Sequence, residues 1–461
     1  MTYSALRIAL LSLPCLAAAF EQQQVFDITA NPQAQLERAG ILRRFKPQRW
    51  DALEEVIKTA ETHNLDIWQI HTGNDPYVDV FTPHSIPNLP VTLLTVPHTT
   101  TNITYPTPPF ARTQQEWDLS TLQNTTFHNE YHSQSEVDLF LRKLVELHPQ
   151  TVSLVELGHT AEGREMLGLK ISKVANTTMA KLGFVVMGPQ HAREWVATST
   201  ALHFAHSLLV NSSESGSLSY LLDTYDFHII PSPNPDGYVY TWESDRFWYK
   251  NRQIVGPGAK CIGIDMNRNW GFKWKAHSDS PLFDAKKKKR KDKTPADPCS
   301  HWYPGHRAFE AAEVNNVANY LTKINGAGKG AGKGGVVAFV DLRSYGQMLA
   351  APYSYKCNKL PKDAEDQMEA LHGAAQAGRA VHGMGFSAGS LCELLYTAPG
   401  NILDYVYSTG SIKYTYAAFL RDTGTYGFAL PATWIRPVGE ETGEILAYLA
   451  KFIARQRGIE V

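Results

Sequence analysis

The chain has 461 residues, of which 43% are hydrophobic, 11% aromatic and 19% charged. This composition excludes a wholly disordered chain, a collagen-like repeat and a coiled coil, and the length suits one large domain with a smaller attachment. Lys and Arg (44) nearly balance Asp and Glu (45), so no overall electric field favours nucleic acid or an anionic membrane as a partner.

Residues 1–19 have the features of a secretory signal peptide: a lone Arg7, an apolar run and three alanines before position 20. Pro14 interrupts the run, which is shorter than the ~20 residues of a membrane span, and no later stretch is long enough to cross a membrane. We therefore expect a secreted protein with no transmembrane span. Four Asn-x-Ser/Thr sequons agree with secretion and predict glycosylation at Asn102, Asn124, Asn176 and Asn211.

Removal of the signal peptide leaves an even number of cysteines, namely Cys261, Cys299, Cys357 and Cys392. In an oxidising compartment this number predicts two disulfides, and the residues alone leave all three pairings open.

The pattern of residues 39–69 predicts a strand, a helix and a strand, so we assign residues 20–98 to a small α/β unit. A Thr- and Pro-rich stretch follows, which we interpret as a linker over residues 99–126. Residues 127–461 alternate apolar runs with helical periods, which indicates a mixed or parallel sheet covered by helices. The runs lie at 183–187, 227–230 and 336–342, and the helical periods at 310–321 and 441–453.

The segment AKKKKRKDK at residues 285–293 lies inside an expected Lys-rich insertion, residues 271–298. Like charges in one block repel one another and resist packing, so we interpret the segment as a solvated surface loop. Cleavage by a dibasic-specific protease and binding to a polyanion are the two alternatives.

His191 and Glu194 follow an apolar strand and offer a metal ion one nitrogen and one carboxylate oxygen. That spacing is common by chance, but five motifs occur along the chain: HAREW (191–195), PNPDGY (233–238), IDMNRNW (264–270), SYGQ (344–347) and LRDTGTYGF (420–428). Taken together, they resemble the zinc metallocarboxypeptidases of the A/B family, in the family's order.

The resemblance implies an eight-stranded mixed α/β sheet flanked by helices, preceded by a small α/β pro-segment. It also implies the disulfides Cys261–Cys299 and Cys357–Cys392. In the family, zinc is held by the His and Glu of the first motif and by a second His directly before the Ser-Tyr pair. Here that last position is Arg343.

A guanidinium stays protonated and has no free lone pair, so Arg343 is not a zinc ligand, and His191 and Glu194 are left as the only metal ligands. We therefore expect zinc to be weakly bound or absent. We hypothesise instead that Arg343 points into the cleft and forms a charge-assisted pair with Glu194.

Two further positions depart from the catalytic pattern of the family. Phe419 stands where the resemblance places the general-base Glu, and Tyr249 stands where it places the Arg that stabilises the oxyanion. A general base typically contributes ~10²–10⁴ in rate and one oxyanion donor ~10²–10³, so no catalytic group is intact and efficient hydrolysis is not expected.

The groups that hold a peptide's C-terminus are retained. By resemblance, Arg268 beside Asn267 is the carboxylate clamp, Tyr396 closes over bound peptide, and Leu403 at the pocket bottom suits an apolar side chain. His191 and Glu194 belong to the same substrate-binding set, and three further members line the cleft further out, namely Arg193, Ser344 and Tyr345.

The chain is therefore interpreted as a secreted, catalytically inactive metallocarboxypeptidase-like protein that binds peptide or protein C-termini. It is most similar to the inactive metallocarboxypeptidase-like proteins of fungi, which implies a role in cell-wall organisation, cell-wall components as partners and a secreted or vacuolar location. Two alternatives stay open: a weakly active zinc carboxypeptidase, and a structural wall protein that does not use the cleft.

Overall fold

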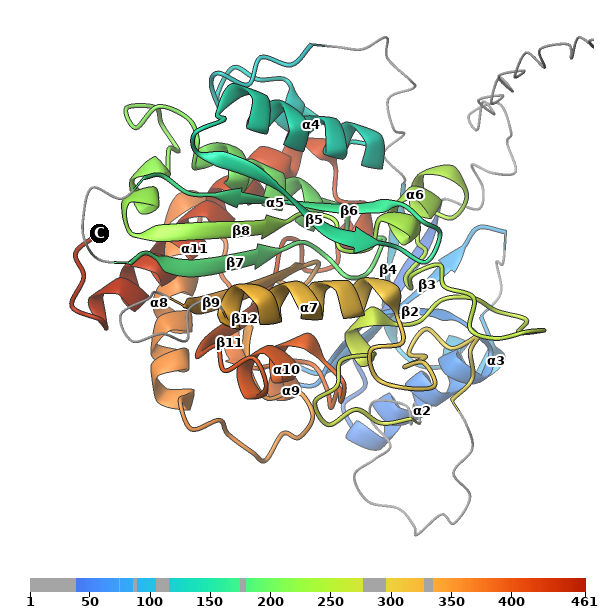
Figure 1. The fold of residues 1–461 in the computed structure, drawn as a ribbon. Coiled ribbons are helices and arrows are strands. Elements are labelled where there is room, and N and C mark those ends of the chain that lie inside the picture. Colours follow the sequence, from blue (N-terminus) through green and yellow to red (C-terminus); the bar gives the residue numbers. More distant parts are fainter. Residues whose placement is uncertain are drawn as a thin grey trace, which may run out of the picture.

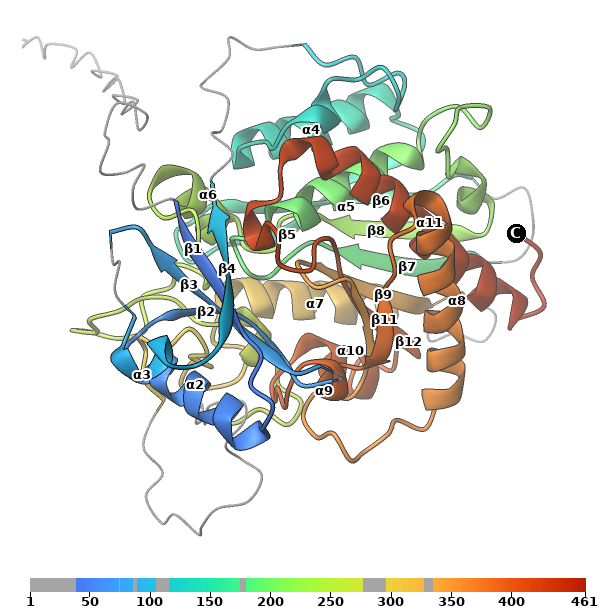
Figure 2. The ribbon, with the colours of Figure 1, turned by 180° about the vertical axis from the view of Figure 1, so that it is seen from behind.

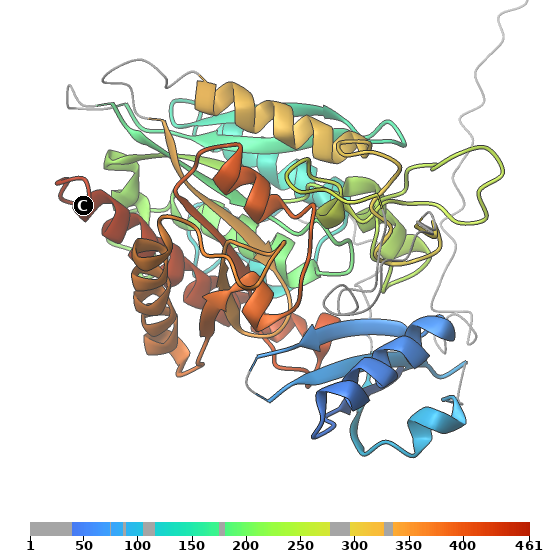
Figure 3. The same cartoon turned by 90° about the horizontal axis from the view of Figure 1, so that it is seen from below.

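The computed structural model of the protein describes residues 39–73, 75–85, 89–104, 116–174, 180–276, 296–326 and 335–461 (Figure 1). The predicted signal peptide (1–19), the sequon at Asn176 and residues 277–295 of the Lys-rich insertion lie outside them. The described chain forms a small N-terminal unit, blue in Figure 3, packed against one side of a larger domain.

The N-terminal unit, as we call residues 39–104, is a four-stranded antiparallel sheet in the order β2-β3-β1-β4, with helices on one face. Its elements are β1 (Gly40–Phe45), α2 (Trp50–Thr62), β2 (Asp66–His71), β3 (Tyr77–Pro83), α3 (Val91–Leu94) and β4 (His98–Ile103). The predicted strand, helix and strand are confirmed. Alternation along β3 sends Val78 and Val80 into the core under α2, while Asp79 and Phe81 face the larger domain.

The bounds predicted for the linker, residues 99–126, were wrong at both ends. Strand β4 continues to Ile103 and pairs with β1 along its whole length, because the β-branched threonines of this stretch favour an extended strand. At the other end, Leu119 is buried in the core of the larger domain. The N-terminal unit thus extends beyond residue 98, and the larger domain begins before residue 127.

The larger domain is built on an eight-stranded mixed sheet, as expected, in the order β11-β10-β12-β9-β7-β8-β6-β5. Strands β12, β9, β7 and β8 run parallel, and antiparallel pairs flank them. The strands are β5 (Val152–His159), β6 (Glu165–Ile171), β7 (Leu182–Met187), β8 (Tyr225–Ile230), β9 (Val336–Arg343), β10 (Met348–Ala351), β11 (Ser387–Ser390) and β12 (Tyr414–Phe419).

Helices cover both faces of this sheet, because the central strands are apolar on both sides. In β7, Phe184 and Val186 pack under the helices α4 (Gln134–Leu147), α5 (Trp195–Ser207), α8 (Ala364–His382) and α11 (Ile435–Arg455). Figure 2 shows α8 and α11 in front. Val185 and Met187 pack under α7 (Ala312–Gly326), α9 (Leu391–Leu394) and α10 (Ile402–Ser408). Helix α6 (Pro235–Glu243) follows β8. None of the described helices is long and apolar enough to cross a membrane.

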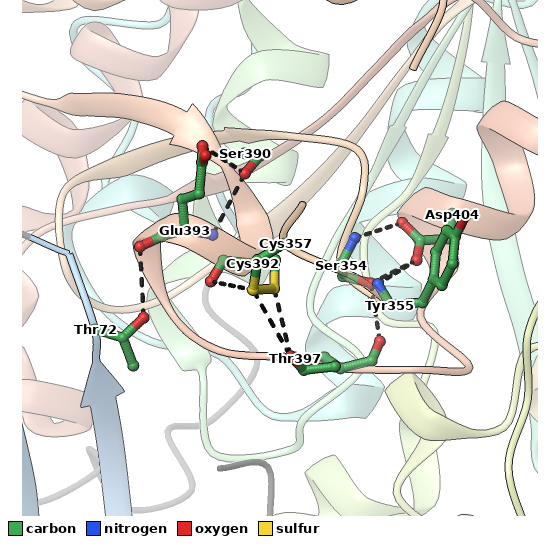
Figure 4. Close-up of a disulfide and its surroundings, with 10 residues drawn as sticks. Thr72, Ser354, Tyr355, Cys357, Ser390, Cys392, Glu393, Thr397 and Asp404 are labelled. Carbon is green, nitrogen blue, oxygen red and sulfur yellow. Dashed lines mark hydrogen bonds between the residues drawn. A yellow bond between two sulfur atoms is a disulfide. The ribbon is translucent and has the colours of Figure 1, made fainter. Parts of the chain in front are cut away.

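Both expected disulfides are confirmed, Cys261–Cys299 and Cys357–Cys392. Figure 4 shows the second, which ties the start of α9 to the loop after β10. The hydroxyl of Thr397 lies 3.7 Å and 3.5 Å from its two sulfur atoms. Thr72, at the end of β2, donates from its backbone N to Leu394 O (3.3 Å), so this segment is held by the disulfide on one side and by the N-terminal unit on the other.

Candidate functional site

The candidate site lies where the parallel strands β7, β9 and β12 end. Because the carboxyl ends of parallel strands meet at one edge of a sheet, this edge gathers side chains from distant parts of the sequence. His191 and Glu194 follow β7, and Glu194 is the N-cap of α5. Arg343 ends β9 and Phe419 ends β12, and these two residues are register partners on neighbouring strands.

Arg343 points into this edge, and its predicted pairing with Glu194 is confirmed. Its Nε donates to Glu194 Oε2 and its Nη2 to Glu194 Oε1, both at 3.1 Å. Nη2 also contacts His191 Nδ1. The backbone N of Ser344 adds a 2.8 Å hydrogen bond to Glu194 Oε2. Arg343 is 5% exposed and Glu194 2%, so the pair is screened from water.

The charge of Arg343 acts mainly on Glu194. Burial by itself would raise the pKa of Glu194, but the attraction of Arg343 and the hydrogen bond from His191 outweigh burial and lower that pKa. Asp341 lies further from the guanidinium, with Oδ2 3.4 Å from Nη1. Burial, reinforced by the negative charge of Glu194, raises the pKa of Asp341 to about 7. Arg343 therefore compensates Glu194 more fully than Asp341.

Both ring nitrogens of His191 have protein partners. Its Nδ1 lies 2.9 Å from Glu194 Oε1 and its Nε2 lies 2.9 Å from Asp265 Oδ1. Burial by itself would raise the pKa of Asp265, but the nearby charge of Arg268, with His191, lowers it. The His191 ring stacks on Tyr249, with 3.7 Å between ring centroids. His191 is thus fixed by carboxylates and an aromatic face.

These residues do not fit a catalytic zinc ion. Such a site needs three protein ligands and an open position. Here His191 and Glu194 could serve as two metal ligands, and the guanidinium of Arg343 contacts both side chains. Among the described residues, no group of three His, Cys, Asp or Glu side chains is arranged to hold a metal ion.

Phe419 and Tyr249 supply neither a base nor a positive charge. The Phe419 ring centroid lies 5.6 Å from Cζ of Arg343, close enough for a cation–π contact. Tyr249 is 8% exposed, and burial raises the pKa of its hydroxyl well above the ordinary value, so the hydroxyl stays neutral.

The predicted carboxylate pocket is assembled next to this edge. Arg268 donates from Nη2 to the Tyr396 hydroxyl (3.1 Å) and from Nη1 to Asn267 O (3.0 Å). The nearest approach to Asp265 is 3.9 Å, which is an ion pair without a hydrogen bond. The Asn267 side chain accepts from the backbone N of Ile402 (3.1 Å), so it organises the wall. The predicted residues His191, Glu194, Asn267, Arg268, Ser344, Tyr345, Tyr396 and Leu403 all line one cavity.

The N-terminal unit forms part of the wall of this cavity. Residues 67–70 of β2 form part of its lining, and about 60 Å³ remains for water-sized molecules. Arg193 Nη1 donates to both carboxylate oxygens of Asp66 at 2.9 Å. The Tyr345 hydroxyl donates to Asp79 Oδ2 at 2.6 Å, and Gln69 donates to Tyr345 O at 2.9 Å. Arg193 and Tyr345, expected to line the outer cleft, here hold the N-terminal unit.

Sequence reasoning missed four carboxylates of this region. Asp265 lies inside the IDMNRNW motif, and Asp341 stands two residues before Arg343, so strand alternation could have placed it on the same face. Asp66 and Asp79 carried no signal, since only docking of the N-terminal unit brings them to Arg193 and Tyr345.

Comparisons with known proteins agree with this arrangement. The family model described as zinc carboxypeptidase matches residues 137–445. The inactive metallocarboxypeptidase ECM14 of Paracoccidioides brasiliensis (strain Pb03) is 32% identical over 443 residues, covering 88% of this chain and 71% of that protein. The protein of the same name from Ajellomyces dermatitidis is 30% identical over 475 residues, covering 95% and 76%.

Solved structures share the fold. Thrombin-activatable fibrinolysis inhibitor superposes with a TM-score of 0.75 at 26% identity, covering 91% of this chain and 99% of that one. Carboxypeptidase A from Helicoverpa armigera superposes with a TM-score of 0.74 at 24% identity, covering 91% and 98%. With the matched family model and these relatives, the chain belongs to the zinc carboxypeptidase family, as one of its inactive members.

Proposed function

We propose that this protein binds the C-terminal carboxylate of peptides or proteins in the Arg268 pocket and does not hydrolyse them. The observation that carries the proposal is the state of Arg268, which is buried at the cavity wall. Within the described chain it has no carboxylate within hydrogen-bond distance, and its partners are the Tyr396 hydroxyl and a backbone carbonyl. A buried guanidinium with spare donors is suited to a carboxylate ligand.

The same proposal attributes the lack of hydrolysis to three positions. Phe419 accepts no proton, Tyr249 offers a neutral donor, and Arg343 stands at the place of a metal ligand. Losses within one catalytic unit do not multiply, but the general base alone typically contributes ~10²–10⁴ in rate. We infer that zinc is weakly bound or absent, because the positively charged guanidinium of Arg343 lies against both remaining metal ligands, Glu194 and His191.

Peptide binding is tested with a free-acid peptide that ends in an apolar residue and its C-terminally amidated twin, on the full secreted chain. A charge-assisted hydrogen bond contributes about 1.5–3 kcal/mol, so the free acid is expected to bind at least about tenfold more tightly. Arg268→Gln should remove the difference. Arg142→Gln is the control, since Arg142 is an exposed residue that pairs with Glu165. Equal affinity of the two peptides would contradict the proposal.

A second candidate is a structural protein that does not use the cleft. The position of β2 favours it, because residues 67–70 form part of the cavity wall and leave less room for a peptide. No measurable binding of either peptide, together with an unchanged biological role for Arg268→Gln, would support this candidate.

Location and cell-wall association also belong to the proposal. Secretion or delivery to a vacuole is supported by the signal-like residues 1–19 and by the two disulfides. Glycosylation is supported by the exposure of Asn102, Asn124 and Asn211. A role in cell-wall organisation, with wall components as partners, follows from the resemblance to the inactive fungal proteins. Endoglycosidase treatment and N-terminal sequencing of secreted protein test the first two, and wall fractionation tests the third.

A further inference from the structure

Several buried carboxyl groups surround the ends of β7 and β9, and they need compensation. Glu194, Asp265 and Asp341 are 2%, 0% and 0% exposed. An isolated carboxylate is costly to bury, and a buried ion pair that loses one partner is strongly destabilised. A carboxylate that stays ionised here, as Glu194 does, therefore requires a cation beside it, whether or not the protein hydrolyses anything.

Arg343 is that cation for Glu194. In the described chain, no other guanidinium or ammonium group is hydrogen-bonded to Glu194, and Arg343 contacts it through two N–H groups. The same guanidinium contacts His191 Nδ1. One side chain thus touches both residues that the family would use to hold a metal.

The position of the guanidinium is itself fixed. Arg343 leaves the end of β9 beside its register partner Phe419, whose ring lies 5.6 Å from Cζ. An aromatic ring packs against a cation without adding a competing carboxylate. The replacements at positions 343 and 419 are therefore in contact and suit one another.

We propose that Arg343 is an internal replacement for the metal ion: a positioning residue whose charge holds Glu194, and through Glu194 the His191 ring, so that the cleft folds without zinc. This inference rests on the metal-free part of the proposed function. It predicts that the protein's stability depends on Arg343 and is indifferent to metal.

The experiment measures zinc content and melting temperature of the full chain, with EDTA and with added zinc. Wild type should contain no stoichiometric zinc and should melt at the same temperature in both conditions. Arg343→Met leaves Glu194 uncompensated and should melt about 3–5 °C lower, with or without zinc. Arg343→His should be destabilised in EDTA, and zinc should restore its melting temperature with about one ion bound per chain.

The matched control is Arg421→His. Arg421 is also buried and donates from Nε to Glu441 Oε2 at 2.9 Å, but this pair lies outside the cavity. The control should lose stability, and zinc should not restore it. A merely structural arginine at position 343 would behave as this control does.

The outcomes separate the two proposals. Stoichiometric zinc in wild type, with a lower melting temperature in EDTA, would overturn both the inference and the metal-free part of the proposed function. A metal-free wild type with an unchanged Arg343→Met variant would overturn the inference alone. If Arg343→Met fails to fold, Arg343→His produced with zinc and then treated with EDTA decides the question: no loss of melting temperature would overturn the inference. Peptide binding is read independently by the free-acid and amide pair.

Discussion

Asp79 should contribute both to the stability of the N-terminal sheet and to its docking on the larger domain. It is 0% exposed and accepts three hydrogen bonds: from Arg44 Nε (2.7 Å), Arg44 Nη2 (2.6 Å) and the Tyr345 hydroxyl (2.6 Å). It therefore links a strand of the N-terminal unit to the loop after β9 of the larger domain.

The cost of Asp79→Ala can be worked from these contacts. Breaking a buried ion pair costs about 3–5 kcal/mol, and a hydroxyl left without a partner costs about 1–3 kcal/mol. The Arg44 side chain is 21% exposed and lies over the Tyr77 ring at 3.9 Å, so water and the ring retain part of its stabilisation. We expect a total loss of about 4 kcal/mol in the free energy of unfolding.

The assay is urea denaturation of the full chain, followed by tryptophan fluorescence. Trp68 reports on this interface, because it packs on Phe81, Phe247 and Phe428 there. Tyr345→Phe removes one hydrogen bond and should cost about 1 kcal/mol. Asp51→Ala removes the exposed pair with Arg49 and should change stability by less than about 0.5 kcal/mol. An Asp79→Ala variant within about 1 kcal/mol of wild type would refute this reasoning.

Two further predictions concern acid and redox stability. Burial lowers the pKa of His203 to about 3 and of His206 to about 4, so both stay neutral in the fold but take up protons when unfolded below about pH 6.5. The free energy of unfolding, measured by urea denaturation, should be highest above pH 6.5 and should fall by about 2 kcal/mol per histidine between pH 6.5 and pH 5. His206→Gln should make this pH dependence less steep. A wild-type stability that does not change with pH in this range would contradict the prediction. Replacing Cys357 and Cys392 by Ser removes a disulfide between residues 35 positions apart and should lower the free energy of unfolding by about 4 kcal/mol. A loss below about 1 kcal/mol in the same urea assay would mean that this bridge constrains the unfolded chain little.

The sequence by itself determined the elements whose residues repeat with a clear period. The apolar runs at 183–187, 227–230 and 336–342 became β7, β8 and β9, because strands buried on both faces need uninterrupted apolar residues. Four of the five motifs directly follow a parallel strand, which brings their side chains to one edge of the sheet, whereas IDMNRNW reaches that edge from the loop after α6. The pairing of Arg343 with Glu194 could be predicted, because a buried carboxylate beside an arginine leaves little choice of partner.

The Thr-rich strand β4 could not be predicted from its local sequence. Its composition suits both a solvated linker and an edge strand, and only pairing with β1 decides between them.

The tertiary structure alone decided what covers the site. Asp66 and Asp79 lie on the face of the N-terminal sheet that meets Arg193 and Tyr345, and those contacts join residues more than a hundred positions apart. No periodicity within either segment encodes such a pairing. It depends on how two separately folded surfaces fit, which is set by their shapes and buried charges together.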